Sequence, residues 1–138
     1  MISNLQFGSD LGLDQRVIDE IAPQITFITS NCEIEALALV SQEGYVIAFS
    51  CLPQYKIDGD RFGGLSSAIL MTARSAMNSL FGENINEIIV RGETGYFIVS
   101  NAGRFVLVGA GTIIQTMMKT VKVFRIAANK IREILSRV

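Results

Sequence analysis

Residues 34–50 read IEALALVSQEGYVIAFS and indicate two short strands joined by a tight turn. The first strand, Ile34–Ser41, is apolar on both faces from Ala36 onward, which is typical of a central strand in a sheet that is covered on both sides. Gln42, Glu43 and Gly44 supply the turn, and Gly44 tolerates a positive φ. Tyr45–Ser50 returns as the second strand, so we expect an antiparallel hairpin at the centre of the fold.

Helical periodicity appears on both sides of this hairpin. Apolar residues recur every three or four positions from Leu13 to about Ser30, and Asp14 is placed either to cap this helix or to charge its first turn favourably. Pro23 predicts a kink or a split. A long helix is predicted from about Asp60, which is placed to cap it, to Phe81, and Gly82 is placed to end it.

Three further strands are predicted at residues 86–91, 96–100 and 105–110, separated by glycine-containing turns. A last helix is expected from Thr112, as its N-cap, to about Arg137. The order α-β-β-α-β-β-β-α predicts an α+β fold with a five-stranded antiparallel sheet and helices on both faces. We expect one domain at residues 13–138, preceded by a flexible leader at residues 1–12.

The composition excludes several function classes. The 138 residues include no histidine, which removes the Ser-His-Asp and Cys-His arrangements and the commonest zinc sites. Cys32 and Cys51 form no ligand or redox motif, so we expect two reduced thiols, with a disulfide or redox role as the alternative. Although 49% of the residues are hydrophobic, no apolar run approaches the roughly 20 residues that a membrane span needs, and no signal peptide is apparent. These features predict a cytoplasmic protein without membrane insertion.

Two sequence patterns resemble ligand sites but fail on their details. Gly109–Thr112 lies between a strand and a helix, as phosphate loops do, but it lacks both GxGxxG and GK[ST]. Asp58 and Asp60 are too few for a calcium loop. We therefore predict no catalytic residue, no cofactor, no metal and no enzymatic activity.

The charge is unevenly distributed although the net charge is only −1. Residues 1–60 carry nine acidic against two basic side chains, a net −7, whereas residues 112–138 carry six basic against one acidic, a net +5. The basic C-terminal helix indicates either a solvated face or weak contact with a membrane surface, and no nucleic-acid partner is expected.

The predicted central helix carries two uncharged stripes. The larger side chains, at positions 62, 65, 69, 73, 76 and 80, are expected to pack on the sheet. Small residues on the second stripe would allow another helix to approach closely, and the following strand is a candidate sheet edge. We therefore predict a dimer interface, with burial within the same domain or an exposed small-residue face as alternatives. The predicted interface comprises Gly64, Ser67, Ala68, Met71, Ser75, Asn78, Ile88 and Val90.

The order and spacing of these features resemble the Roadblock family of dynein light-chain-like domains, over about residues 13–137. The hairpin turn carries Ser41, Glu43 and Gly44, the central helix begins with an acid at Asp60, and the strands that follow match at five positions. Those five positions are Glu87, Ile88, Ile89, Gly95 and Tyr96.

The resemblance implies a function, in particular that of the bacterial and archaeal GTPase regulators of the family. It implies a homodimer paired through the central helix and the next strand into one continuous sheet. It also implies a non-catalytic scaffold or regulator on which a small Ras-like GTPase docks. On the paired central helices, Arg61, Arg74 and Asn78 are the expected polar contacts.

Three other classes of protein share parts of this pattern. A profilin-like actin-binding protein would present exposed aromatic residues on its terminal helices, and a longin-like trafficking module would place the long helix elsewhere in the order. A small-molecule sensor would need a roomy pocket. The first two remain the alternative functional readings of the sequence.

Overall fold

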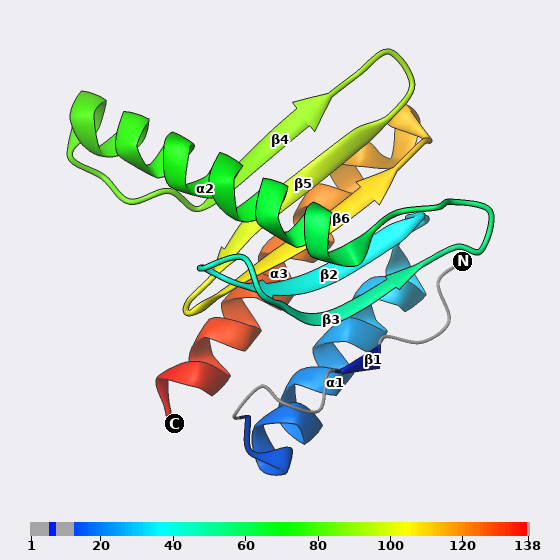
Figure 1. Cartoon of the computed structure of the whole chain (residues 1–138), viewed down its shortest axis with the longest axis horizontal. Helices are drawn as coiled ribbons and strands as arrows, with labels where there is room; N and C mark the ends of the chain where they lie inside the picture. Colours follow the sequence, from blue (N-terminus) through cyan, green and yellow to red (C-terminus); the bar gives the residue numbers. More distant parts are fainter. Residues whose placement is uncertain (1–5, 8–12, 138) are drawn as a thin grey trace.

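The computed structural model describes residues 6–7 and 13–137, which form a three-layer α+β domain (Figure 1). A six-stranded antiparallel sheet of order β1-β3-β2-β6-β5-β4 forms the middle layer. The strands are β1 (Gln6–Phe7), β2 (Ala36–Ser41), β3 (Val46–Cys51), β4 (Glu87–Arg91), β5 (Tyr96–Ala102) and β6 (Phe105–Gly111). The helices are α1 (Gln15–Asn31), α2 (Gly59–Phe81) and α3 (Met117–Ser136), with a short 3-10 turn η1 (Ile114–Thr116) before α3.

The predicted fold class is confirmed, because five strands and three long helices occur in the expected order. Two-residue strand β1 is additional: it pairs with β3 at the sheet edge opposite β4 and lies within the predicted leader. The remaining leader residues, 1–5 and 8–12, lie outside the described residues.

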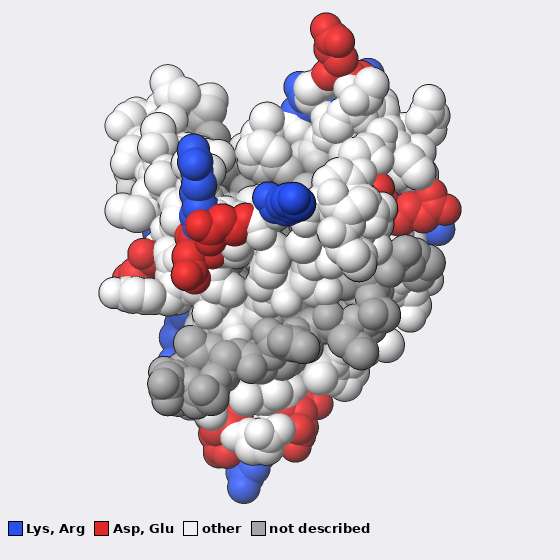
Figure 2. Space-filling model, turned by 45° about the vertical axis from the view of Figure 1, so that its right-hand side comes forward, with Lys and Arg blue, Asp and Glu red and all other residues white. Residues whose placement is uncertain are grey.

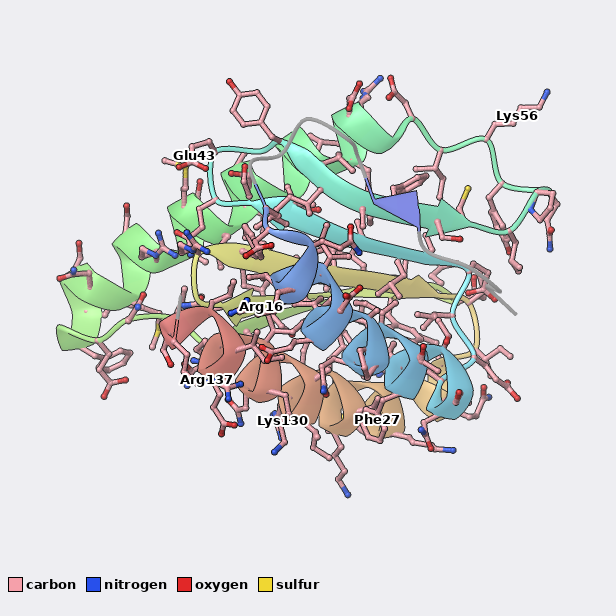
Figure 3. The ribbon with its side chains drawn as sticks, turned by 90° about the horizontal axis from the view of Figure 1, so that it is seen from below. Arg16, Phe27, Glu43, Lys56, Lys130 and Arg137 are labelled. Atoms are coloured by element: carbon pink, nitrogen blue, oxygen red, sulfur yellow. The ribbon has the colours of Figure 1, made fainter. Side chains whose placement is uncertain are left out.

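The helices cover the two faces of the sheet unequally. Helices α1 and α3 pack together on one face, and α2 lies alone on the other (Figure 3). A large apolar core between the sheet and the α1–α3 pair includes Ile21, Leu39 and Phe124, all fully buried. A smaller core beneath α2 is built around Val40 and Leu70.

Helix α1 is not split at Pro23, contrary to one of the expected outcomes. Of the two roles expected for Asp14, the structure shows the N-cap: its carboxylate accepts a hydrogen bond from the Arg16 amide at 3.2 Å. Pro23 lies on the exposed side of the helix, where water can satisfy the carbonyl that loses its partner. Burial of Ile21 and Ile25 on either side of Pro23 holds the two halves in one helix.

The N-cap of helix α2 lies two residues before the predicted one. Asp58, not Asp60, is the N-cap, and its carboxylate accepts hydrogen bonds from the amides of Asp60 and Arg61 at 3.1 and 3.4 Å. Gly82 ends the helix with φ of 66°, as predicted for a left-handed C-cap.

The predicted sheet-facing stripe of α2 is only partly right, because Phe62 and Ala73 pack against the core beneath α2 but both leucines of the stripe do not. Leu65 and Leu80 are more than half exposed, whereas the buried side of the helix consists of small residues and one leucine. A Cβ atom on Gly63 would lie 2.8 Å from Val46 Cγ2 and 3.1 Å from the Gly44 carbonyl, so the helix backbone lies almost against the β2–β3 hairpin. Close backbone packing therefore selected the small side of the helix. The buried α2 residues are Gly63, Ser66, Ser67 and Leu70.

The segment before α3 also differs from the prediction. Thr112 does not cap the helix; its hydroxyl donates to Glu35 Oε1 at 3.0 Å, tying the end of β6 to the residue before β2. The chain first makes η1, and α3 begins at Met117. The Tyr96 hydroxyl lies 3.0 Å from the Thr120 hydroxyl and fixes the first turn of α3 on β5.

Replacing the observed cap of α2 should cost more than replacing the predicted one. Asp58→Ala removes two hydrogen bonds to helix amides and should lower the free energy of unfolding by about 1 kcal/mol. Asp60→Ala removes only a favourable interaction with the helix dipole and should cost less. Urea denaturation of both variants measures the difference; an equal or larger loss for Asp60→Ala would contradict the cap assignment.

Candidate interaction surface

The outward side of α2 is uncharged and rich in exposed apolar side chains. Leu65 is 54% exposed, Met71 56%, Leu80 71% and Phe81 68%. From residue 64 to residue 81 the only charged side chain is Arg74, which is half-buried. Figure 2 shows one face of the molecule, on which charged side chains form separate groups with uncharged surface between them. Apolar side chains exposed side by side on one helix mark a surface for another macromolecule.

Strand β4 continues this surface at the edge of the sheet. Of the described strands, only β5 pairs with β4, so one side of β4 keeps its backbone hydrogen-bonding groups free. Ile88 and Val90 pair with Val99 and Phe97, which belong to the core beneath α2, so both lie on the α2 face of the sheet. Helix α2 lies mainly over β2, β3 and β6, and Val90 remains 37% exposed.

Most of the predicted interface residues lie on this surface, which we name the α2–β4 surface: the exposed side of α2 together with the free edge of β4. One predicted residue does not: Ser67 is buried, and its hydroxyl donates to the Gln42 carbonyl in the β2–β3 turn. Ser67 therefore holds α2 against its own domain and is not available to a second copy. The exposed predicted residues on α2 are Gly64, Ala68, Met71, Ser75 and Asn78.

The three predicted polar contacts do not converge on one point. Arg61 and Asn78 are exposed, but at a rise of 1.5 Å per residue they lie about 25 Å apart along the helix. Arg74 is half-buried, and its Nε is buried without a hydrogen-bond partner among the described residues. The arrangement fits an extended contact along α2 and offers no compact polar pocket.

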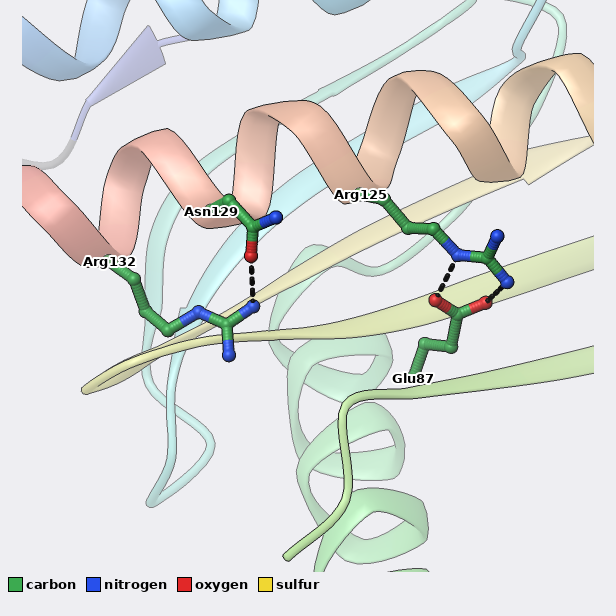
Figure 4. Close-up of polar contacts among 4 residues, drawn as sticks. All are labelled: Glu87, Arg125, Asn129 and Arg132. Carbon is green, nitrogen blue, oxygen red and sulfur yellow. Dashed lines mark hydrogen bonds and ion pairs between the residues drawn. The ribbon is translucent and has the colours of Figure 1, made fainter.

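A second polar group lies on the opposite face of the sheet, beneath α3 (Figure 4). Arg125 Nε and Nη2 donate to the two carboxylate oxygens of Glu87 at 2.6 and 2.8 Å. These hydrogen bonds, more than the charge attraction, raise the pKa of Arg125. Arg132 Nη2 donates to Asn129 Oδ1 at 2.6 Å. No pattern in the sequence indicates the Glu87–Arg125 pair, because 38 residues separate its partners and only the tertiary fold brings them together.

The basic α3 helix is partly neutralised by local acids. Arg137 approaches Glu20 of α1 at 3.8 Å, and Lys130 approaches Glu133 at 3.9 Å. Both basic residues are labelled in Figure 3. Lys119 and Lys122 are exposed and have no acidic partner within the described residues. One exposed ion pair therefore connects α1 and α3, and the outer face of α3 remains mildly basic.

The two cysteines are free thiols in different surroundings. Cys32 is buried, and this burial raises the pKa of its thiol, while a hydrogen bond from Thr120 and the charge of Lys119 partly oppose the rise. Cys51 is half-buried and donates to the Tyr55 carbonyl at 3.5 Å. The expectation of reduced thiols agrees with this arrangement.

Within residues 6–7 and 13–137, no group of three or more His, Cys, Asp or Glu side chains could hold a metal ion. The helices of the same residues are too short or too polar to cross a membrane.

Three helices on an antiparallel sheet, with a long central helix beside a free sheet edge, define an α+β interaction module. The model of the Roadblock/LC7 domain matches residues 24–110, more than half of the chain. The chain therefore belongs to the Roadblock/LC7 family. No curated protein sequence matches the chain.

Solved structures share the fold at low sequence identity. The gliding protein mglB of Thermus thermophilus superposes with a TM-score of 0.77 at 18% identity, covering 95% of this chain and 99% of that one. A structure described as MglB with a tetrameric arrangement gives a TM-score of 0.76 at 19% identity, covering 94% and 98% of the two chains. Myxococcus xanthus MglB gives 0.68 at 20% identity, covering 86% and 96%.

The two thiols should differ in reactivity. Because burial both shields Cys32 and raises its pKa, at pH 8 it should carry less thiolate than a free cysteine and react far more slowly with Ellman's reagent than Cys51. Cys32→Ser and Cys51→Ser assign the two phases, and urea should make both thiols react quickly. Faster labelling of Cys32 in the folded protein would contradict its burial.

Proposed function

We propose that this protein is a non-catalytic, homodimeric scaffold or regulator that binds a small Ras-like GTPase. The observation that carries the proposal is the α2–β4 surface, where an uncharged helix face adjoins a free strand edge. Membership of the Roadblock/LC7 family supports it. The proposal places the protein in the cytoplasm.

The sequence of β4 supports self-association. Antiparallel pairing of two copies of Glu87–Arg91 about Ile89 would place each Glu87 opposite the partner copy's Arg91. The same register would place Ile88 opposite Val90 on the α2 face, so the strand is self-complementary in both charge and apolar character. Two sheets would then join into one.

Small side chains on α2 support a helix contact above the joined sheet. Gly64, Ala68 and Ser75 are exposed and small, so a second helix backbone can approach closely. Leu65, Met71 and Leu80 would lose much of their exposed apolar area in such a dimer. A stable interface of this kind typically buries at least about 1,200 Å².

The GTPase would dock on the outer side of the paired α2 helices. Arg61 and Asn78 stand exposed at opposite ends of α2, so an antiparallel helix pair would bring Arg61 of one copy near Asn78 of the other. Arginine is favoured at interfaces because its planar guanidinium forms paired hydrogen bonds. We propose that any effect on GTP hydrolysis is indirect, through ordering of the GTPase's own switch loops.

Charge changes on the α2–β4 surface should weaken the dimer. Arg91→Glu would place like charges opposite each other at both ends of the paired strands and should weaken dimerisation by roughly tenfold. Ala68→Arg would bury an unpaired charge between the helices and should yield monomers. Sedimentation equilibrium at micromolar concentration measures both effects.

Arg16→Glu is the matched control, because Arg16 is exposed on α1, in the layer opposite α2 (Figure 3). It makes the same charge change and should leave the dimer intact. A wild-type protein that sediments as a monomer, or an Arg91→Glu variant as tight as wild type, would contradict the proposed interface.

Binding and catalysis can be separated with three alanine variants. Arg61→Ala and Asn78→Ala should each weaken binding of a GTP-loaded Ras-like GTPase by about fivefold to tenfold, whereas Arg74→Ala should have less effect because Arg74 is half-buried. Single-turnover GTP hydrolysis should be no slower per bound complex in any of them, because we propose that none of these side chains acts in catalysis. Loss of an arginine that did act in the GTPase site would slow hydrolysis by roughly 10³-fold or more.

Two results would count against this proposal. Loss of stimulated hydrolysis with binding intact in one variant would show that the chain supplies a catalytic group. Failure of the dimer to bind any small Ras-like GTPase would remove the proposed partner while leaving the dimer itself standing.

A further inference from the structure

A cavity of about 180 Å³ lies between α3 and the β4–β5 pair, on the face of the sheet opposite α2. Glu87 of β4 lines it and also belongs to the proposed dimer edge, but every lining residue comes from one chain, so the site does not require the dimer. A water molecule occupies roughly 30 Å³ of liquid, so the cavity has room for several waters or for one small ion with part of its hydration shell. Its lining residues are Asn86, Glu87, Ser100, Arg125, Ala128, Asn129 and Arg132.

Ser100 is the most unusual member of this lining. It faces the α3 side of β5, in the same register as Ile98 and Ala102, which are buried in the large core. Its side chain is 2% exposed, yet its hydroxyl has no hydrogen-bond partner among the described residues. A buried hydroxyl normally finds a partner, so a ligand or water in the adjoining cavity is the expected acceptor of its proton.

The positive charge in the cavity exceeds the negative charge. Glu87 uses both carboxylate oxygens on Arg125, so these two charges compensate each other. The Arg132 guanidinium makes one hydrogen bond, to the neutral amide of Asn129 (Figure 4). One positive charge therefore remains without an acidic partner in the described lining.

Unused hydrogen-bond donors approach the cavity from both the helix and the strands. Among the described residues, Arg132 Nε and Nη1 make no hydrogen bond, and the Asn129 contact uses Oδ1 and leaves the amide nitrogen available. Asn86, from the segment before β4, and Ser100, from β5, line the other side, and the Ser100 hydroxyl has no partner among the described residues. The small side chain of Ala128 keeps the space between these donors open.

We propose that this cavity is a binding site for one small tetrahedral oxyanion of the phosphate class. A tetrahedral anion directs its oxygens to several sides at once, so it can accept hydrogen bonds from Arg132 and from Ser100 together. Its charge compensates that of Arg132, and guanidinium groups match phosphate oxygens in geometry. Two donors from α3 and two from the β4–β5 side would then share one ligand.

The site is tested by titrating the full-length protein with inorganic phosphate at constant ionic strength, followed by phosphorus NMR and calorimetry. Binding should saturate at millimolar concentration or below. Arg132→Gln and Ser100→Ala should each raise the Kd by about tenfold or more, because each removes a hydrogen bond to a charged ligand.

Lys122→Gln is the matched control, because it removes one positive charge from the exposed side of the same helix. This variant should change the Kd for phosphate by no more than about twofold. If phosphate were held only by general charge attraction, Lys122→Gln would weaken binding as much as Arg132→Gln. Ser100→Ala removes no hydrogen bond present among the described residues, so it should fold normally, and its effect reports on the ligand.

The source of the phosphate group is distinguished by parallel titrations with glycerol 3-phosphate. Tighter binding of the ester would assign the site to a phosphate carried on a larger molecule, and tighter binding of inorganic phosphate to the free ion. Acetate, which is planar, should bind more weakly than either. No saturable phosphate binding to wild type, or equal binding by wild type and Ser100→Ala, would overturn the proposal.

Discussion

The close approach of α2 to the β2–β3 hairpin is the constraint on which the rest of the surface depends. Gly63 has no room for a Cβ, and the Gly44 turn lies against Gly64 and Ser67. Because the helix must bring its backbone so near the hairpin, its small residues face inward. Its larger apolar residues, such as Leu65 and Leu80, are consequently left facing solvent. A single packing requirement thus stabilises the domain and creates the apolar face of the α2–β4 surface.

The two faces of the sheet carry hydrophobic cores of different size. On the α1–α3 face, branched aliphatic residues and Phe124 fill a dense core that accounts for most of the fully buried large side chains. That core makes the sheet rigid enough to hold a lone helix on the other face. The core beneath α2 is smaller, and apolar side chains of α2 such as Leu65 and Leu80 remain exposed and available for association. Most of the buried core therefore lies on one side of the sheet, and the proposed dimer surface lies on the other.

Strand β4 joins these two sides. Its alternate residues reach the α2 face through Ile88 and Val90 and the α3 face through Glu87 and Ile89. The paired hydrogen bonds between Glu87 and Arg125 hold the strand against α3 although the arginine is half exposed. An edge strand fixed in this way keeps a defined register, which self-association through its free edge would require.

The sequence by itself determined the element order, the central hairpin, the caps at Asp14 and Gly82 and the edge position of the strand that follows α2. These features depend on local periodicity and on residues with restricted backbone preferences, which act over a few positions. Tertiary structure alone decided which side of α2 faces the sheet, because hydrophobicity favours the leucines but backbone approach favours glycine and serine. It also decided the cavity beneath α3, since Ser100, Arg125 and Arg132 come together only when separate elements pack. Contacts between residues distant in the chain leave no periodic signal in the sequence.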